Sequence, residues 1–104
     1  MDRRYFDEYI GDAFYKGRVV RRLSQERFVE ITNKLWLEKY EPKRKKGCSR
    51  SVYARYESGD VSMPIGFYKA GCDVLEMDWI NLFEDATKYE LDRLIEDGEF
   101  PKGG

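Results

Sequence analysis

The side chains best suited to contact a ligand lie between Gly47 and Gly59, where the spacing predicts a short helix from Ser49 to about Ser58. Tyr53 and Tyr56 are three residues apart and would face the protein interior. The opposite face would carry small and basic side chains: Arg50, Ser51, Ala54 and Arg55. Such a face suits insertion into the major groove of DNA, where bulky or acidic side chains would clash or repel. We predict base contacts by Arg50 and Arg55; the alternative is a pair of ordinary surface arginines.

A run of four cations precedes this helix: Lys43, Arg44, Lys45 and Lys46. Cations beside a groove-binding helix follow DNA phosphates and add affinity without sequence preference. We therefore predict phosphate contacts by these four residues. The alternative is a solvated loop whose charges only keep the chain soluble.

Charge is distributed unevenly along the 104 residues, although 19 basic and 20 acidic side chains nearly cancel to a net charge of -1. Residues 1–15 hold 2 basic and 4 acidic side chains, residues 16–55 hold 13 and 4, and residues 56–104 hold 4 and 12. The segment charges are therefore -2, +9 and -8. Such asymmetry points to nucleic acid or an acidic surface as partner, although short windows of a highly charged chain also fluctuate by chance.

The acidic surplus gathers near the C-terminus, in Glu84, Asp85, Glu90, Asp92, Glu96, Asp97 and Glu99. These carboxylates could mimic DNA or bind a basic partner, and a solvated helix face is the alternative. A solvated acidic face would repel DNA and so orient the basic half of the chain toward it.

The composition argues against most enzymes. The chain has no histidine, which excludes histidine bases, nucleophiles paired with histidine and histidine metal ligands. Two cysteines, Cys48 and Cys72, are too few for a zinc site, and no glycine motif for phosphate binding occurs. We expect no enzymatic activity, no metal and no cofactor. The sequence contains no secretory leader and no apolar span, so we expect a cytoplasmic chain without a membrane partner.

Hydrophobic periodicity predicts an all-α fold of five or six helices without strands. The first three expected helices run from Asp2 to near Arg22, from a Ser24 cap to about Tyr40 and from a Ser49 cap to about Ser58. A fourth begins around Pro64 or Ile65, and its inner face continues to Leu75. A fifth begins after an Asp78 cap, with residues 91–95 in a final turn or sixth helix. Residues 1–104 would form one domain. Most aromatic side chains lie at core spacing, so we expect them to pack rather than to stack on bases.

Several motifs occur in a particular order along the chain: Ile10-Gly11, Phe14 and Arg18, then Leu23-Ser24-Gln25-Glu26, then Tyr56-Glu57-Ser58-Gly59, and last Leu75 with Trp79, Leu82 and Phe83. Together they resemble the phage-repressor, Cro and xenobiotic-response-element type of helix-turn-helix regulator over roughly residues 10–83. The resemblance implies a compact lambda-repressor-like core, with residues 84–104 as a C-terminal helical extension and tail.

The resemblance also implies roles for matching residues. Gln25 and Ser49 would contact phosphates from the N-termini of the second and third helices. Arg50 and Ser51 would contact base edges, and Arg55 a base or a phosphate. Arg18 and Glu57 would form a structural ion pair.

The chain departs from the family between its second and third helices, where about a dozen extra residues, roughly 33–46, replace a tight turn. We interpret them as a lengthened second helix followed by the basic loop. Ser62-Met63 also stands where relatives often carry basic residues that contact the DNA backbone.

These features predict a sequence-specific, double-stranded DNA-binding transcriptional regulator, a bacterial or phage repressor. It would act as a homodimer on a near-palindromic operator, with the residues after Asp78 as the dimer interface. The alternative is a protein-interaction module on the same fold, an antitoxin or anti-repressor, whose acidic C-terminal half binds a basic partner.

Overall fold

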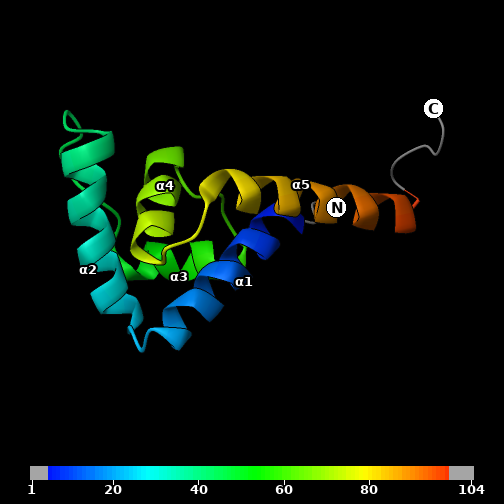
Figure 1. The fold of residues 1–104 in the computed structure, drawn as a ribbon, viewed down its shortest axis with the longest axis horizontal. Helices are drawn as coiled ribbons and strands as arrows, with labels where there is room; N and C mark the ends of the chain where they lie inside the picture. The colour runs from blue at the N-terminus through cyan, green and yellow to red at the C-terminus, as the bar shows by residue number, and fades with distance from the viewer. Residues whose placement is uncertain (1–4, 99–104) are drawn as a thin grey trace.

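The computed structural model describes residues 5–98, and this part of the chain contains five α-helices, one π-helical turn and no strand (Figure 1). In chain order the elements are α1 (Tyr5–Val20), α2 (Gln25–Leu35), the π-helical turn η1 (Trp36–Tyr40), α3 (Arg50–Ser58), α4 (Ile65–Val74) and α5 (Trp79–Glu96). The predicted all-helical fold class is confirmed. Residues 91–95 belong to α5, so they form neither a separate turn nor a sixth helix.

Three helices begin directly after the residues that the sequence predicts as N-caps. The hydroxyl groups of Ser24 and Ser49 and the carboxylate of Asp78 each accept a hydrogen bond from the backbone N–H three residues further on, at 3.0 to 3.1 Å. Each such cap contributes about 1 kcal/mol. α1 ends at Val20, slightly before its expected end, and the expected start at Asp2 lies outside the described residues.

The core is built mainly from aromatic side chains. The ring centroids of Phe28 and Tyr53 are 5.2 Å apart and join α2 to α3, while those of Trp36 and Phe67 are 5.5 Å apart and join η1 to α4. These four side chains and that of Phe14 are fully buried. Burying one such side chain contributes about 1.5 to 3 kcal/mol, so the aromatic residues hold the first four helices together.

Two glycines allow α1 and α3 to approach closely. A Cβ atom at Gly11 would lie 2.3 Å from the backbone oxygen of Glu57, so no side chain fits at this crossing. Gly59 ends α3 with a φ of 84°, in the left-handed region that glycine adopts without strain. A Cβ atom at Gly59 would also lie 2.8 Å from the Cα atom of Glu8. The inner side of α3 is therefore fixed against α1.

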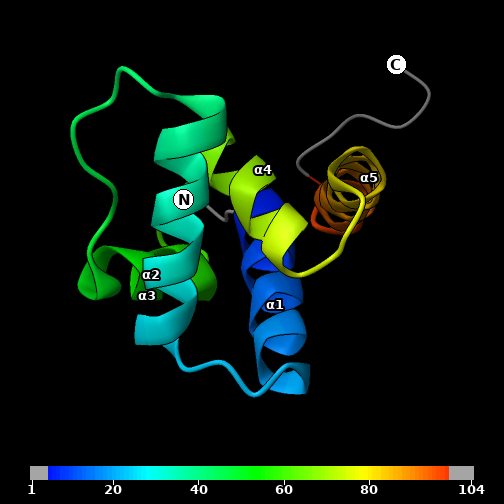
Figure 2. The same ribbon diagram turned by 60° about the vertical axis from the view of Figure 1, so that its left-hand side comes forward.

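α5 packs on α1, and α1 and α4 separate it from α2 and α3 (Figure 2). The ring centroids of Phe6 and Phe83 are 4.9 Å apart, and those of Tyr9 and Tyr89 are 5.3 Å apart. The acidic last helix thus lies away from the basic connection that precedes α3. Within residues 5–98, no helix combines the length and the apolar character that crossing a membrane requires.

Candidate nucleic-acid interface

The connection between the second and third helices is long and exposed. α2 continues directly into η1, which ends at Tyr40, and residues 41–49 then lead to α3. Figure 2 shows this connection running along the outside of the molecule, from the far end of η1 back to the start of α3. It carries the four consecutive cations of residues 43–46, and all four side chains are exposed.

The connection is tied to the second helix near both of its ends. The side-chain amide of Asn33 donates to the backbone oxygen of Cys48 at 2.8 Å, and its oxygen accepts from the backbone N–H of Cys48 at 3.1 Å. At the other end, the indole N–H of Trp36 donates to the carboxylate of Glu41. The guanidinium carbon of Arg44 lies 4.2 Å from the centroid of a Trp36 ring, a cation–π contact. These contacts fix both ends of the connection that carries the cations, and they place the Arg44 side chain against Trp36.

The four cations of the connection differ in their contacts. Nε of Arg44 donates to the backbone oxygen of Lys46 at 3.0 Å, so Arg44 also shapes the connection. Lys43, Lys45 and Lys46 are exposed, and their ammonium groups form no ion pair with any residue from 5 to 98. Three of the four cations are therefore available to an external anion.

Ion pairs neutralise many basic side chains, but not those of the connection and α3. In residues 16–55, five basic side chains pair with carboxylates: Lys16, Arg18, Arg21, Arg27 and Lys39. No ion pair within the described part of the chain involves the other eight, which are Arg22, Lys34, Lys43, Arg44, Lys45, Lys46, Arg50 and Arg55. Six of these eight lie in the connection or on α3, so the uncompensated charge of the +9 segment is concentrated there.

The exposed face of α3 has small side chains along its middle and an arginine on each edge. At 100° per residue, Ala54, Ser58 and Ser51 fall between Arg50 on one edge and Arg55 on the other. Both arginines and both serines are exposed, and Ala54 is half-buried. A face of this shape can approach a DNA groove closely while two guanidinium groups reach its base edges.

The N-terminus of α3 adds backbone donors to this face. The hydroxyl oxygen of Ser49 accepts from the N–H of Val52 at 3.1 Å, so it serves as the cap. The first N–H groups of a helix have no partner within the helix and point along its axis, where they favour an anion. Ser49 is exposed, so an incoming phosphate can reach this end of α3.

Glu57, on the inner side of α3, is the centre of a buried network. Its carboxylate accepts from Nε and Nη2 of Arg18 at 2.9 and 2.8 Å, from the Gln25 amide at 3.0 Å and from the Tyr53 hydroxyl at 2.5 Å. The side chains of Arg18 and Glu57 are only 11% and 8% exposed. Burial alone would raise the pKa of Glu57, but the hydrogen bonds from Arg18, Tyr53 and Gln25 outweigh it and lower that pKa. The ionised carboxylate therefore holds α1, α2 and α3 together.

Gln25 links this network to the exposed face of α3. Its Nε2 donates to Glu57, and its Oε1 accepts from Nη1 of Arg50 at 3.3 Å. The Arg50 guanidinium is thus positioned through Gln25 by the buried ion pair. A phosphate contact by Gln25 would have to share or replace these two hydrogen bonds.

Sequence reasoning missed the residues that hold the connection in place. The spacing of Trp36 predicts a core residue. Nothing in that spacing indicates its hydrogen bond to Glu41 or its cation–π contact with Arg44. Asn33 offered a signal, because an amide on the inner side of a helix needs hydrogen-bond partners. Its partner, Cys48, is 15 positions away and could not be chosen from the sequence.

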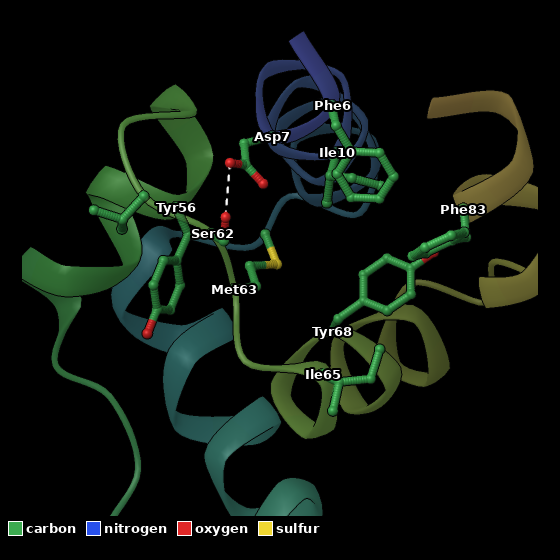
Figure 3. Close-up of a pocket in the computed structure, with 10 residues that line it drawn as sticks. Phe6, Asp7, Ile10, Tyr56, Ser62, Met63, Ile65, Tyr68 and Phe83 are labelled. Atoms are coloured by element: carbon green, nitrogen blue, oxygen red, sulfur yellow. Dashed lines mark hydrogen bonds between the residues drawn. The ribbon is translucent and has the colours of Figure 1, made fainter. Parts of the chain in front are cut away.

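A cavity of about 160 Å³ lies between α1, α5 and the connection from α3 to α4 (Figure 3). Its lining is mostly apolar and aromatic. Apart from tyrosine hydroxyls, the polar groups in the lining are the Asp7 carboxylate and the Ser62 hydroxyl, and Ser62 donates to Asp7 at 2.7 Å. Phe83 and Ile65 stand at its rim and are 47% and 58% exposed. The cavity suits an apolar group better than a charged substrate.

Both cysteines of the chain are free thiols. Burial raises the pKa of Cys48 to about 11 and that of Cys72 to about 12, so neither is a thiolate at neutral pH. Among residues 5–98, no group of three or more metal-binding side chains is close enough to hold an ion.

The fold and the exposed basic surface define a small all-helical domain whose positive charge is concentrated on one short helix and on the connection before it. Comparison with known proteins adds no family to this description. No family model, no curated protein and no solved structure matches the chain.

Proposed function

We propose that the chain is a sequence-specific DNA-binding repressor that places α3 in the major groove of double-stranded DNA. The concentration of uncompensated cations on α3 and on its preceding connection carries the proposal. Arg50 and Arg55 contact base edges, and Ser51 contacts a base between them. The small side chains along the middle of the face permit the close approach that base contact requires.

Phosphate contacts surround these base contacts. Ser49 meets a phosphate at the N-terminus of α3, and Gln25 meets one at the N-terminus of α2. The cations of residues 43–46 follow the backbone beyond the groove, with Arg44 also maintaining the shape of the connection. One α3 helix covers only half of an operator, so two copies bind a near-palindromic site.

The test is a selection of duplexes from a random pool, followed by gel shifts at rising salt. The proposal expects a preferred sequence, and it expects Arg55→Ala and Arg50→Ala each to weaken binding to that sequence by about tenfold to a hundredfold. Arg21→Ala is the matched control, because it removes one exposed arginine whose partner is Glu76, away from α3. A pool that yields no preferred sequence, or Arg50 and Arg55 variants that bind like the Arg21 control, would refute the proposal.

A protein-interaction module, an antitoxin or anti-repressor, is the second candidate. Exposed Glu84, Asp85 and Asp92 on α5 favour it, because none of them forms an ion pair within residues 5–98. Other carboxylates of the cluster are engaged: Glu90 accepts from the backbone N–H of Phe6 at 3.4 Å, Asp97 accepts from Tyr5, and Glu96 pairs with Arg93. Glu99 lies outside the described residues.

The two candidates differ in the surface that matters. If the acidic face of α5 binds a basic partner, Asp85→Lys and Asp92→Lys abolish that binding and leave DNA affinity no weaker. If α3 is the functional surface, Arg50→Ala and Arg55→Ala remove the activity while both α5 variants retain it.

A further inference from the structure

The cavity between α1, α5 and the α3–α4 connection has walls that are joined by contacts on three sides. Ser62 of the connection donates to Asp7 of α1 at 2.7 Å. The ring centroids of Phe6 and Phe83, from α1 and α5, are 4.9 Å apart. The hydroxyl of Tyr68, from α4, donates to a backbone oxygen at the start of α5 at 2.5 Å. Because each contact joins two different elements, the walls cannot easily move together, and the cavity is a property of the fold.

Aromatic rings form much of the cavity wall. They belong to Phe6, Tyr56, Tyr68 and Phe83. The hydroxyl of Tyr68 is engaged with α5, and Figure 3 shows the hydroxyl of Tyr56 directed away from the cavity. A water molecule against these rings would lack the two to four polar partners, roughly, that a buried water needs. An aromatic molecule would instead gain dispersion and edge-to-face contacts with the wall.

The size of the cavity limits the ligand to about one ring. Its volume is about 160 Å³, and a cavity of about 150 Å³ lined by apolar side chains accommodates benzene. Ile65 and Phe83 stand at the rim and are 58% and 47% exposed, so a small molecule can enter from solvent without unfolding of the chain. A single six-membered ring with a small substituent therefore fits.

The charge of the lining selects an uncharged ligand. The described lining residues include one carboxylate, that of Asp7, and no lysine or arginine. An anionic substituent would lose hydration without a counter-charge and would meet that carboxylate. A cationic substituent would exchange its hydration shell for a single carboxylate that already accepts from Ser62. A neutral hydroxyl can donate to an oxygen of either residue without this cost.

We propose that this cavity binds an uncharged aromatic molecule of one six-membered ring, with a hydroxyl or another small neutral substituent at the edge formed by Asp7 and Ser62. The site lies on the inner side of α3, to which Tyr56 belongs, whereas Arg50 and Arg55 are on the exposed face of that helix. Binding at this site requires no DNA, so it is tested separately from the proposed function.

A titration of the full chain with phenol, followed by methyl NMR, tests the site directly. We expect a dissociation constant on the order of 1 mM, typical of so small a ligand. Nuclear Overhauser effects from the phenol ring should reach the methyl groups of Ile10, Val61 and Ile65, which line the cavity. They should not reach those of Ile80 and Leu91, which are exposed and lie outside the lining.

Benzoate is the matched probe, because it has the same ring with an anionic substituent, and it should bind about tenfold more weakly than phenol. Three results would overturn the proposal: no binding of phenol at 10 mM, on the order of ten times the expected dissociation constant, equal Overhauser effects at the exposed methyl groups outside the lining, or equal affinities for phenol and benzoate.

A charge removal tests the selection against anions. Asp7→Asn keeps an oxygen that accepts from Ser62 but removes the negative charge at the edge of the cavity, so the affinity for benzoate should rise about tenfold while that for phenol changes little. Asp12→Asn is the matched control, because Asp12 is exposed on the same helix and pairs with Lys16. Equal benzoate affinities of the two variants would contradict the placement of the ligand beside Asp7.

Discussion

Replacing Glu57 with glutamine should destabilise the chain by about 3 kcal/mol. Arg18 and Glu57 are 11% and 8% exposed, so the substitution leaves the Arg18 guanidinium buried without its counter-charge. Removing one partner of a buried pair costs about 3 to 5 kcal/mol. The lower end applies because the glutamine oxygen still accepts one hydrogen bond and because Nη1 of Arg18 keeps its bond to the backbone oxygen of Leu23 at 2.8 Å.

Urea unfolding at neutral pH, followed by circular dichroism, measures this loss. With a slope of about 1.5 kcal/mol per molar, typical of small domains, the midpoint should fall by about 2 M. Glu30→Gln is the matched control, because Glu30 pairs with Arg27 on the surface and an exposed pair contributes less than about 1 kcal/mol. A Glu57 variant that loses no more stability than the Glu30 control would show that the network does not hold the three helices together.

The same variant has a defined pH dependence. The pKa of Glu57 is lowered in the folded chain, so the unfolded chain binds more protons and stability rises with pH in this range. The contribution of Glu57 is complete above its unfolded pKa of about 4.3 and is lost as pH falls through the lower folded pKa. The stability gap between the parent chain and Glu57→Gln should therefore narrow below about pH 4. A gap that stays constant from pH 7 to pH 3 contradicts this assignment.

Three further changes test the connection and the helix crossing. Asn33→Ala leaves the backbone N–H and oxygen of Cys48 without their partner, so it should lower the free energy of unfolding by about 1 to 3 kcal/mol. It should also speed hydrogen exchange in residues 41–49, and unchanged exchange would show that the two Asn33 hydrogen bonds do not hold the connection in place. Gly11→Ala forces a Cβ atom to within 2.3 Å of the α3 backbone, so the variant should not pack natively and should show no cooperative thermal transition. A variant as stable as the parent chain would contradict the close crossing of α1 and α3. Lys43→Gln combined with Lys45→Gln should reduce the magnitude of the slope of log DNA affinity against log salt concentration by about 2, while the preferred DNA sequence is retained. An unchanged slope would show that neither lysine contacts a phosphate.

The helix boundaries could be predicted because each depends on a few neighbouring residues. The caps at Ser24, Ser49 and Asp78 need only a side-chain oxygen and the next three residues of backbone. Gly59 needs only its freedom to adopt a positive φ. The end of the helical segment at Tyr40 followed in the same way from Pro42, which disfavours helical geometry just before it. The sequence did not indicate that α2 ends at Leu35 and that residues 36–40 form a π-helical turn.

The path of the connection and the full set of hydrogen bonds around Glu57 could not be predicted from the sequence. The path of residues 41–49 is set by bonds from Asn33 and Trp36, and periodicity carries no information about such pairs. The resemblance to helix-turn-helix regulators predicts the ion pair of Arg18 with Glu57, but it does not predict that Gln25 links this pair to Arg50. These features depend on how three helices meet, which is a property of the folded chain.

The concentration of cations in residues 43–50 is difficult to explain by the stability of the free chain. Consecutive Cα atoms are about 3.8 Å apart and the screening length is about 8 Å at physiological salt, so neighbouring lysines repel one another. Several cations elsewhere in the chain are neutralised, as Lys39 with Asp73 shows. Solubility alone would be served equally well by dispersed charges. A polyanion placed against this surface would relieve the repulsion and release its own counterions. The DNA that we propose as the partner would therefore offset this cost to the free chain.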